Sequence, residues 1–153
     1  MDNELLRHIL STVNYRFEKS IAGSHTDFGD FSLGHDSRSP KELVNHMFAV
    51  IHYTRVFIEQ EKMPDEEIED LSFNKEVARF KNELIKVDQL LATKPFDINY
   101  SKKLVQGPFS DVLTHIGQIA MLQRLVENPI PWEDYSKSDL QTGLTDEKAG
   151  ENE

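Results

Sequence analysis

The residues with the clearest potential for chemistry lie in one segment, 107–127 (GPFSDVLTHIGQIAMLQRLVE). When this segment is wound as a helix at about 100° per residue, Asp111, His115 and Gln118 fall in line with Leu122. An acid, an imidazole and an amide then share the face that the apolar residues of the segment would bury. Burying such groups costs free energy unless a partner satisfies them. The segment therefore predicts a site, and the rest of the chain must supply what meets it.

A histidine in an earlier helix could supply a second imidazole to this site. In the helix expected over 40–61, His46 lies on the same face as Val50 and Tyr53, so its side chain should point inward. His52 falls on nearly the opposite side of that helix, and we expect it to face solvent. If the two helices face each other, His46 comes close to the acid and the imidazole of the later segment.

Two imidazoles and one carboxylate from facing helices suit one face of a divalent metal ion, with positions left for water or substrate. We therefore expect His46, Asp111 and His115 to be the metal ligands. Gln118 lies one turn further along, and it would orient a ligand or a metal-bound water. Tyr53 would do the same from the earlier helix. These two residues are the candidates for a catalytic role.

Two interpretations without a metal stay open. In the first, Asp111 complements the helix macrodipole and hydrogen-bonds His115 four residues later. The protein would then be a non-catalytic dimeric bundle, a stress-related interaction or small-ligand-binding protein with a buried Asp–His pair. In the second, a metal-free pocket for a small molecule is lined by Phe28, Tyr53 and the loop 23–38.

Composition excludes several classes of function. The chain has 153 residues, of which 38% are hydrophobic. Its net charge of −10 and its dispersed Lys and Arg argue against a nucleic-acid binder. No apolar run has the length of a membrane span. Cysteine is absent, so no disulfide, thiolate ligand or cysteine nucleophile is possible. The acidic start, MDNELLRHIL, is not typical of a signal peptide, and we expect a cytoplasmic protein.

Apolar residues recur with helical periodicity in four segments, which predicts an all-α four-helix bundle with one long crossover connection. Ser39-Pro40 with Glu42 is a helix-start signal. We expect residues 1–144 to form one domain and 145–153 to form a polar, disordered tail. The connection 96–106 contains a short extended or helical piece. The helices are expected over 2–22, 40–61, 73–93 and 107–127.

Two connections carry aromatic residues that should hold them in place. We expect the long loop 23–38 to be anchored on the bundle by Phe28, Phe31 and Leu33. After the last helix, Trp132 and Tyr135 should pack their segment against the bundle or against a partner subunit.

Three segments, taken in this order, resemble the DinB-like (DinB/YfiT-like) family of four-helix-bundle metalloenzymes. They are RSPKELVNHM at 38–47, DVLTHIGQIAMLQRL at 111–125 and NPIPWEDYSKSDL at 128–140. The family has one histidine on its second helix, matched here by His46, and a His-x-x-x-His pair before a GQI-like turn. The later histidine of the pair matches His115, whereas the earlier one falls on Asp111, a departure.

The resemblance implies a metal-dependent hydrolase or a low-molecular-weight thiol transferase that acts on a small molecule. The metal would lower the pKa of a bound water or thiol and polarise the electrophile. A carboxylate in place of the family histidine still allows zinc, nickel, iron or manganese. The resemblance also implies a homodimer that binds neither nucleic acid nor membrane.

Overall fold

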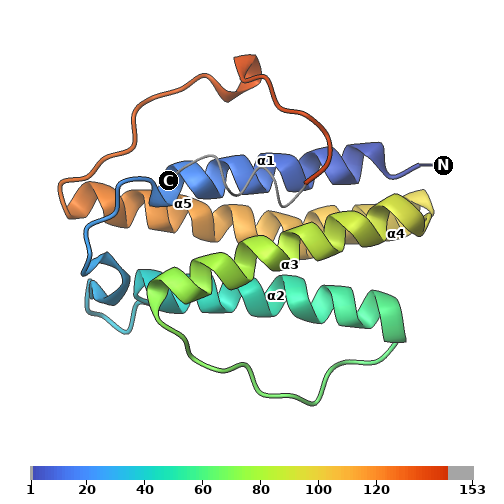
Figure 1. Ribbon diagram of the computed structural model, residues 1–153, viewed down its shortest axis with the longest axis horizontal. Coiled ribbons are helices and arrows are strands. Elements are labelled where there is room, and N and C mark those ends of the chain that lie inside the picture. The colour runs from blue at the N-terminus through green and yellow to red at the C-terminus, as the bar shows by residue number, and fades with distance from the viewer. Residues whose placement is uncertain (1, 145–153) are drawn as a thin grey trace.

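The computed structural model describes residues 2–144, and these residues contain helices but no strand. The expected all-helical bundle is thus confirmed (Figure 1). The tail predicted over 145–153 lies outside the described residues. Within them, no helix combines the length and the apolar character needed to cross a bilayer. The helices are α1 (Glu4–Ile21), α2 (Pro40–Gln60), α3 (Phe73–Thr93), α4 (Ile98–Leu104) and α5 (Ser110–Leu125), with 3-10 turns at Phe28–Asp30 and Tyr135–Lys137.

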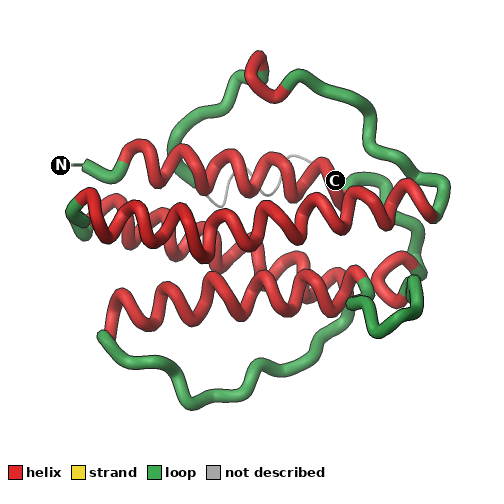
Figure 2. The backbone as a smooth tube through the Cα atoms, turned by 180° about the vertical axis from the view of Figure 1, so that it is seen from behind, coloured by secondary structure: helices red, strands yellow, loops and turns green. Residues whose placement is uncertain are grey.

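The bundle places α3 on one face and α5 on the other, with α1 and α2 at the remaining two corners (Figures 1 and 2). Helices α2 and α3 run parallel, because the connection 61–72 returns along the length of the bundle before α3 begins (Figure 1). The connection 22–39 crosses one end of the bundle and joins the antiparallel α1 and α2. As a result α2 and α5 lie side by side and antiparallel, which is the pairing that the candidate site requires.

The start of α2 is fixed by the signal expected from the sequence. The Ser39 hydroxyl accepts a hydrogen bond from the Glu42 amide at 3.3 Å, and the Glu42 carboxylate accepts one from the Ser39 amide at 2.7 Å. Pro40 occupies the first helical position, where its missing N–H costs nothing. This capping box sets the rotation of α2 and therefore the direction of His46, two turns further on.

The start of α5 differs from the expectation. The sequence predicts a helix that begins at Gly107-Pro108, but α4 continues into α5 through a π-helical turn, Val105–Phe109. Pro108 has no N–H to donate, so a regular turn cannot continue through it. The Ser110 hydroxyl donates to the carbonyl oxygen of Val105 and satisfies part of the widened turn. Asp111 follows directly, so this turn sets the direction of the α5 site residues.

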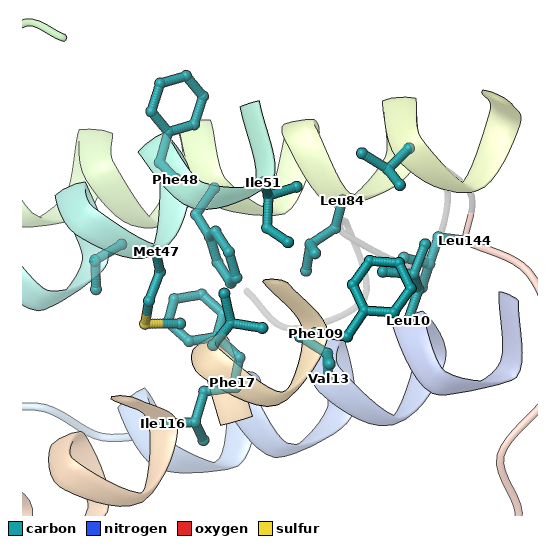
Figure 3. Packing of buried hydrophobic residues seen from close by; sticks show 14 of the residues in the cluster. Leu10, Val13, Phe17, Met47, Phe48, Ile51, Leu84, Phe109, Ile116 and Leu144 are labelled. Carbon is teal, nitrogen blue, oxygen red and sulfur yellow. The ribbon is translucent and has the colours of Figure 1, made fainter. Parts of the chain in front are cut away.

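The core is one cluster of apolar side chains, to which Phe17 and Met47 belong (Figure 3). The rings of Phe17 and Phe80 meet edge to face at 4.7 Å. Phe28 is buried in this core and Phe31 packs against it, as expected for anchors of the loop 23–38. The expectation for Leu33 is wrong, because half of this side chain is exposed.

The segment after α5 is held on α1 by one of its two predicted aromatic anchors. The guanidinium of Arg16 lies 3.9 Å from the centre of the Tyr135 ring. The Tyr15 hydroxyl also donates to the Glu133 carboxylate at 2.7 Å. Trp132, in contrast, is 88% exposed and does not pack against the bundle.

Candidate metal centre

The two facing helices bring together the three residues that the sequence analysis selected as metal ligands. The Asp111 Oδ2 atom on α5 lies 3.4 Å from His46 Nε2 on α2 and 3.4 Å from His115 Nε2 on α5. The two imidazole rings are 4.7 Å apart between centres and nearly perpendicular. One ligand atom from each residue can be chosen so that all three lie within 4.8 Å of one another.

These separations are compatible with a shared cation and are long for direct hydrogen bonds. A distance of 3.4 Å exceeds the usual range of about 2.7–3.2 Å for an N–H···O bond. Ligand atoms placed tetrahedrally at about 2.0–2.1 Å from a zinc ion would be about 3.3 Å from each other. The two nitrogen–oxygen distances are close to that value. The donor set, two nitrogens and one carboxylate oxygen, also leaves at least one position open.

Gln118 fixes the orientation of His115. The His115 Nδ1 atom lies 2.8 Å from the Gln118 Oε1 atom. Because an amide oxygen only accepts hydrogen bonds, Nδ1 must carry the proton, which leaves the Nε2 lone pair for the centre. Such a partner on the second ring nitrogen is a common feature of metal-binding histidines. The orienting role expected of Gln118 therefore has a contact that supports it.

The centre is open to solvent on one side. The His115 side chain is 10% exposed, whereas those of His46 and Asp111 are 32% and 43% exposed. Burial lowers the pKa of His46, the positive charge of Arg38 and the neighbouring His115 lower it further, and Asp111 opposes these effects. A lowered pKa keeps the His46 imidazole neutral near pH 7, which is the form that binds a metal.

Tyr53 lies away from these contacts. Its hydroxyl approaches the Glu66 carbonyl oxygen at 3.5 Å, and its ring is 6.0 Å from that of His52. It lines an apolar groove whose other wall includes Tyr100 and Pro108. Among residues 2–144, no hydrogen bond joins Tyr53 to the three candidate ligands, so its catalytic role stays a prediction.

His52 does not face solvent, and the prediction for this residue is wrong. Its Nδ1 atom lies 3.1 Å from the Glu83 carboxylate and its Nε2 atom 3.1 Å from that of Glu66. Its ring stacks on Phe48 at 5.1 Å. The physical reason is that α3 packs parallel to α2 on this side, so α2 buries two faces rather than one.

A groove next to the centre was not expected from the sequence. It has a volume of about 490 Å³ and lies between α2, α5 and the end of the loop 23–38. Gln118 belongs both to its wall and to the hydrogen bond with His115. Arg38 lies on its rim, and the one signal for it in the sequence is a basic residue directly before the capping serine of α2.

Comparisons with known proteins add no evidence for a function, so the functional argument rests on the geometry of the candidate site. No family model, no curated protein and no solved structure matches this chain.

Proposed function

We propose that the protein is a metal-dependent enzyme with a DinB-like helical bundle. His46, Asp111 and His115 would hold a divalent zinc, nickel, iron or manganese ion. The observation that carries this proposal is the position of one carboxylate oxygen at 3.4 Å from each of two imidazole nitrogens. Two helices that are far apart in the sequence supply these atoms. If Asp111 were simply hydrogen-bonded to one of the histidines, one of the two distances would be shorter than the other.

The reaction class that fits best is hydrolysis or low-molecular-weight thiol transfer on a small molecule. A bound metal supplies a lowered pKa for a coordinated water or thiol and polarises the electrophile. The chain itself contributes the orientation of His115 through Gln118 and the partial burial of His46. The exposed side of Asp111 leaves room for the substrate.

Elemental analysis of the full chain, purified without an affinity tag or chelator, tests the proposal. We expect a stoichiometric divalent metal that is lost in both His46→Ala and His115→Ala. His25→Ala is the matched control, because His25 is exposed in the loop 23–38 and lies outside the cluster. Metal-free wild-type protein that also fails to bind added zinc, nickel or manganese would contradict the proposal.

A homodimer in the cytoplasm is part of the same proposal. Its support is Trp132, which is 88% exposed on a segment otherwise attached to α1. A large exposed aromatic ring is typical of surfaces that contact a partner. Sedimentation velocity should give a dimer for the wild type and a shift toward monomer for Trp132→Ser. A monomeric wild type at micromolar concentration would refute this part.

A further inference from the structure

The groove beside the candidate metal centre has the position of a substrate subsite. Leu43 on its wall lies one turn before His46 on α2, and Gln118 and Leu122 follow His115 on α5. The groove therefore continues the seam between α2 and α5 directly from the centre. A molecule that occupies it would place one end near the open side of the three candidate ligands.

The groove offers a ligand two kinds of contact, an apolar surface and a positively charged side chain. Leu43 and Leu122 are buried side chains, while Leu33 and Met121 leave half or more of their surface exposed to solvent. Exposed apolar side chains that gather around a concave surface are typical of a ligand site. Arg38 is the cationic residue of the lining.

The guanidinium of Arg38 is available to a ligand. Within the described range 2–144, no carboxylate lies within 4.0 Å of it, although Asp36 lines the same groove. In the lining of this groove Arg38 supplies a positive charge and Asp36 a negative one, so a ligand would be recognised by a single guanidinium rather than by a broad positive field.

We propose that the groove binds a small amphipathic anion, with its carboxylate or phosphate group on Arg38 and its hydrocarbon part against Leu43 and Met121. A planar guanidinium pairs with either anionic group through two parallel hydrogen bonds. This inference names the substrate class of the proposed enzyme and rests on that function for the reaction. Binding of the anion itself requires no metal, so the two proposals can fail separately.

A second groove, between α2 and the α4 segment, provides an internal comparison. It lies on the other side of the centre, has a volume of about 320 Å³ and is lined mainly by apolar side chains, among them Tyr53, Phe57 and Tyr100. Its cationic residue is Lys103. A neutral or purely apolar ligand has no reason to choose the Arg38 groove over this one, whereas the proposal assigns the anion to Arg38.

The test is a titration of the ¹⁵N-labelled full chain, metal-free and zinc-loaded, followed by NMR chemical shifts. The probes are hexanoate, hexyl phosphate, hexan-1-ol and hexylammonium, which share one hydrocarbon chain. We expect both anions to shift the signals of Arg38, Leu43, Gln118 and Met121 in the metal-free protein. Hexylammonium should leave these signals unchanged, and the two anions should reveal which headgroup is preferred.

Substitution of Arg38 tests whether its guanidinium binds the negative charge of the ligand. Arg38→Gln should weaken hexanoate binding about five-fold or more, as expected for a charge-assisted pair near the surface. Arg124→Gln is the matched control, because Arg124 is an exposed arginine on α5 outside the groove lining, and binding should be unchanged. Met121→Gln should weaken hexanoate binding without changing the preference for the anion.

The outcomes separate the two proposals. Equal hexanoate affinity in wild type and Arg38→Gln, or shifts confined to the Tyr53 groove, would overturn the anion subsite even if the protein binds zinc. An Arg38-dependent affinity in a protein that binds no metal would support the subsite while the enzymatic function fails. A homodimer that buries Leu33 and Met121 in its interface would also overturn the subsite.

Discussion

Asp111 is the residue on which the candidate centre depends, because its carboxylate oxygen is equally distant from two imidazoles. It lies in the first turn of α5, directly after the π-helical turn through which α4 continues into α5, so no free helix N-terminus lies beside it. The helix macrodipole therefore does not account for an acid at this position. In the proposed DinB-like site a histidine would be usual at this position, and Asp111 would supply one negative charge and an oxygen ligand in its place.

Substitution at this position tests whether the carboxylate is a metal ligand. Asp111→His restores the His-x-x-x-His pattern, and we expect it to keep zinc binding. Asp111→Asn keeps the shape but removes the charge, and we expect zinc affinity to fall at least about ten-fold. Competition with a chromogenic chelator measures both affinities. Tight zinc binding in Asp111→Asn would show that the carboxylate is not a ligand.

His46 should make the stability of the metal-free protein depend on pH. Its pKa in the folded protein is lowered by burial, by Arg38 and by His115, whereas in the unfolded chain it keeps its usual value of 6.5. As the pH falls through that value, the unfolded chain binds a proton that the folded protein resists. The free energy of unfolding should therefore fall with decreasing pH.

Urea unfolding of metal-free wild type and His46→Gln between about pH 7.5 and about pH 5 measures this effect. The wild type should lose stability relative to the variant as the solution becomes more acidic. His25→Gln controls for the loss of a histidine outside the centre. Parallel curves for wild type and His46→Gln would contradict the prediction.

At the scale of the elements, two local features set the directions of the site residues. The capping box of α2 could be predicted, because Ser39, Pro40 and Glu42 act on adjacent backbone groups. The π-helical turn before α5 could not, since Gly107-Pro108 is also the usual signal for a new helix. The three ligands could still be selected, because the spacing of Asp111 and His115 depends only on the helix that follows Pro108.

The pairing of α2 with α3 rests on buried acids that no local pattern reveals. Glu83 on α3 is almost fully buried. Its carboxylate forms an ion pair with the Arg55 guanidinium and also contacts the His52 ring, both from α2. Glu76 is fully buried and bonds Arg79 and Asn45. The partners on α2 lie about 30 residues earlier in the chain, so only the packed structure makes the burial of these acids favourable. The same contacts explain why His52 is not exposed.

Removal of one of these acids should be costly. Glu83→Ala leaves Arg55 partly buried without its carboxylate, and we expect a loss of about 3–5 kcal/mol in the free energy of unfolding. Glu59→Ala is the matched control, because Glu59 pairs with the same Arg55 at the surface, and its removal should cost less than about 1 kcal/mol. Urea titrations give both values. Equal losses in the two variants would show that burial of Glu83 is not the source of its contribution.

At the scale of the whole molecule, the candidate centre lies between two helices that pack against each other but are far apart in the chain. The connection 22–39 leads from α1 into α2 and the connection 61–72 leads from α2 to α3, so neither of them joins α2 to α5. A metal ion would thus tie α2 directly to α5 across their antiparallel seam. The four long helices and the inward faces of the three residues follow from sequence periodicity, whereas the short helix α4, the pairing of α2 with α5 and the grooves beside the centre depend on how the helices pack.

Metal binding should therefore stabilise the entire fold, since the three ligands converge only in the folded chain. At a free zinc concentration about a hundred times the dissociation constant, the free energy of unfolding should rise by about 2.7 kcal/mol. For a domain of this size, that gain corresponds to an increase in melting temperature of roughly 5–10 °C. Calorimetry of the full chain with zinc, and then with excess EDTA, measures the gain and its reversal. His25→Ala should respond like the wild type and His46→Ala should not respond. A gain of the same size in His46→Ala would place the stabilising ion elsewhere and remove the link between α2 and α5.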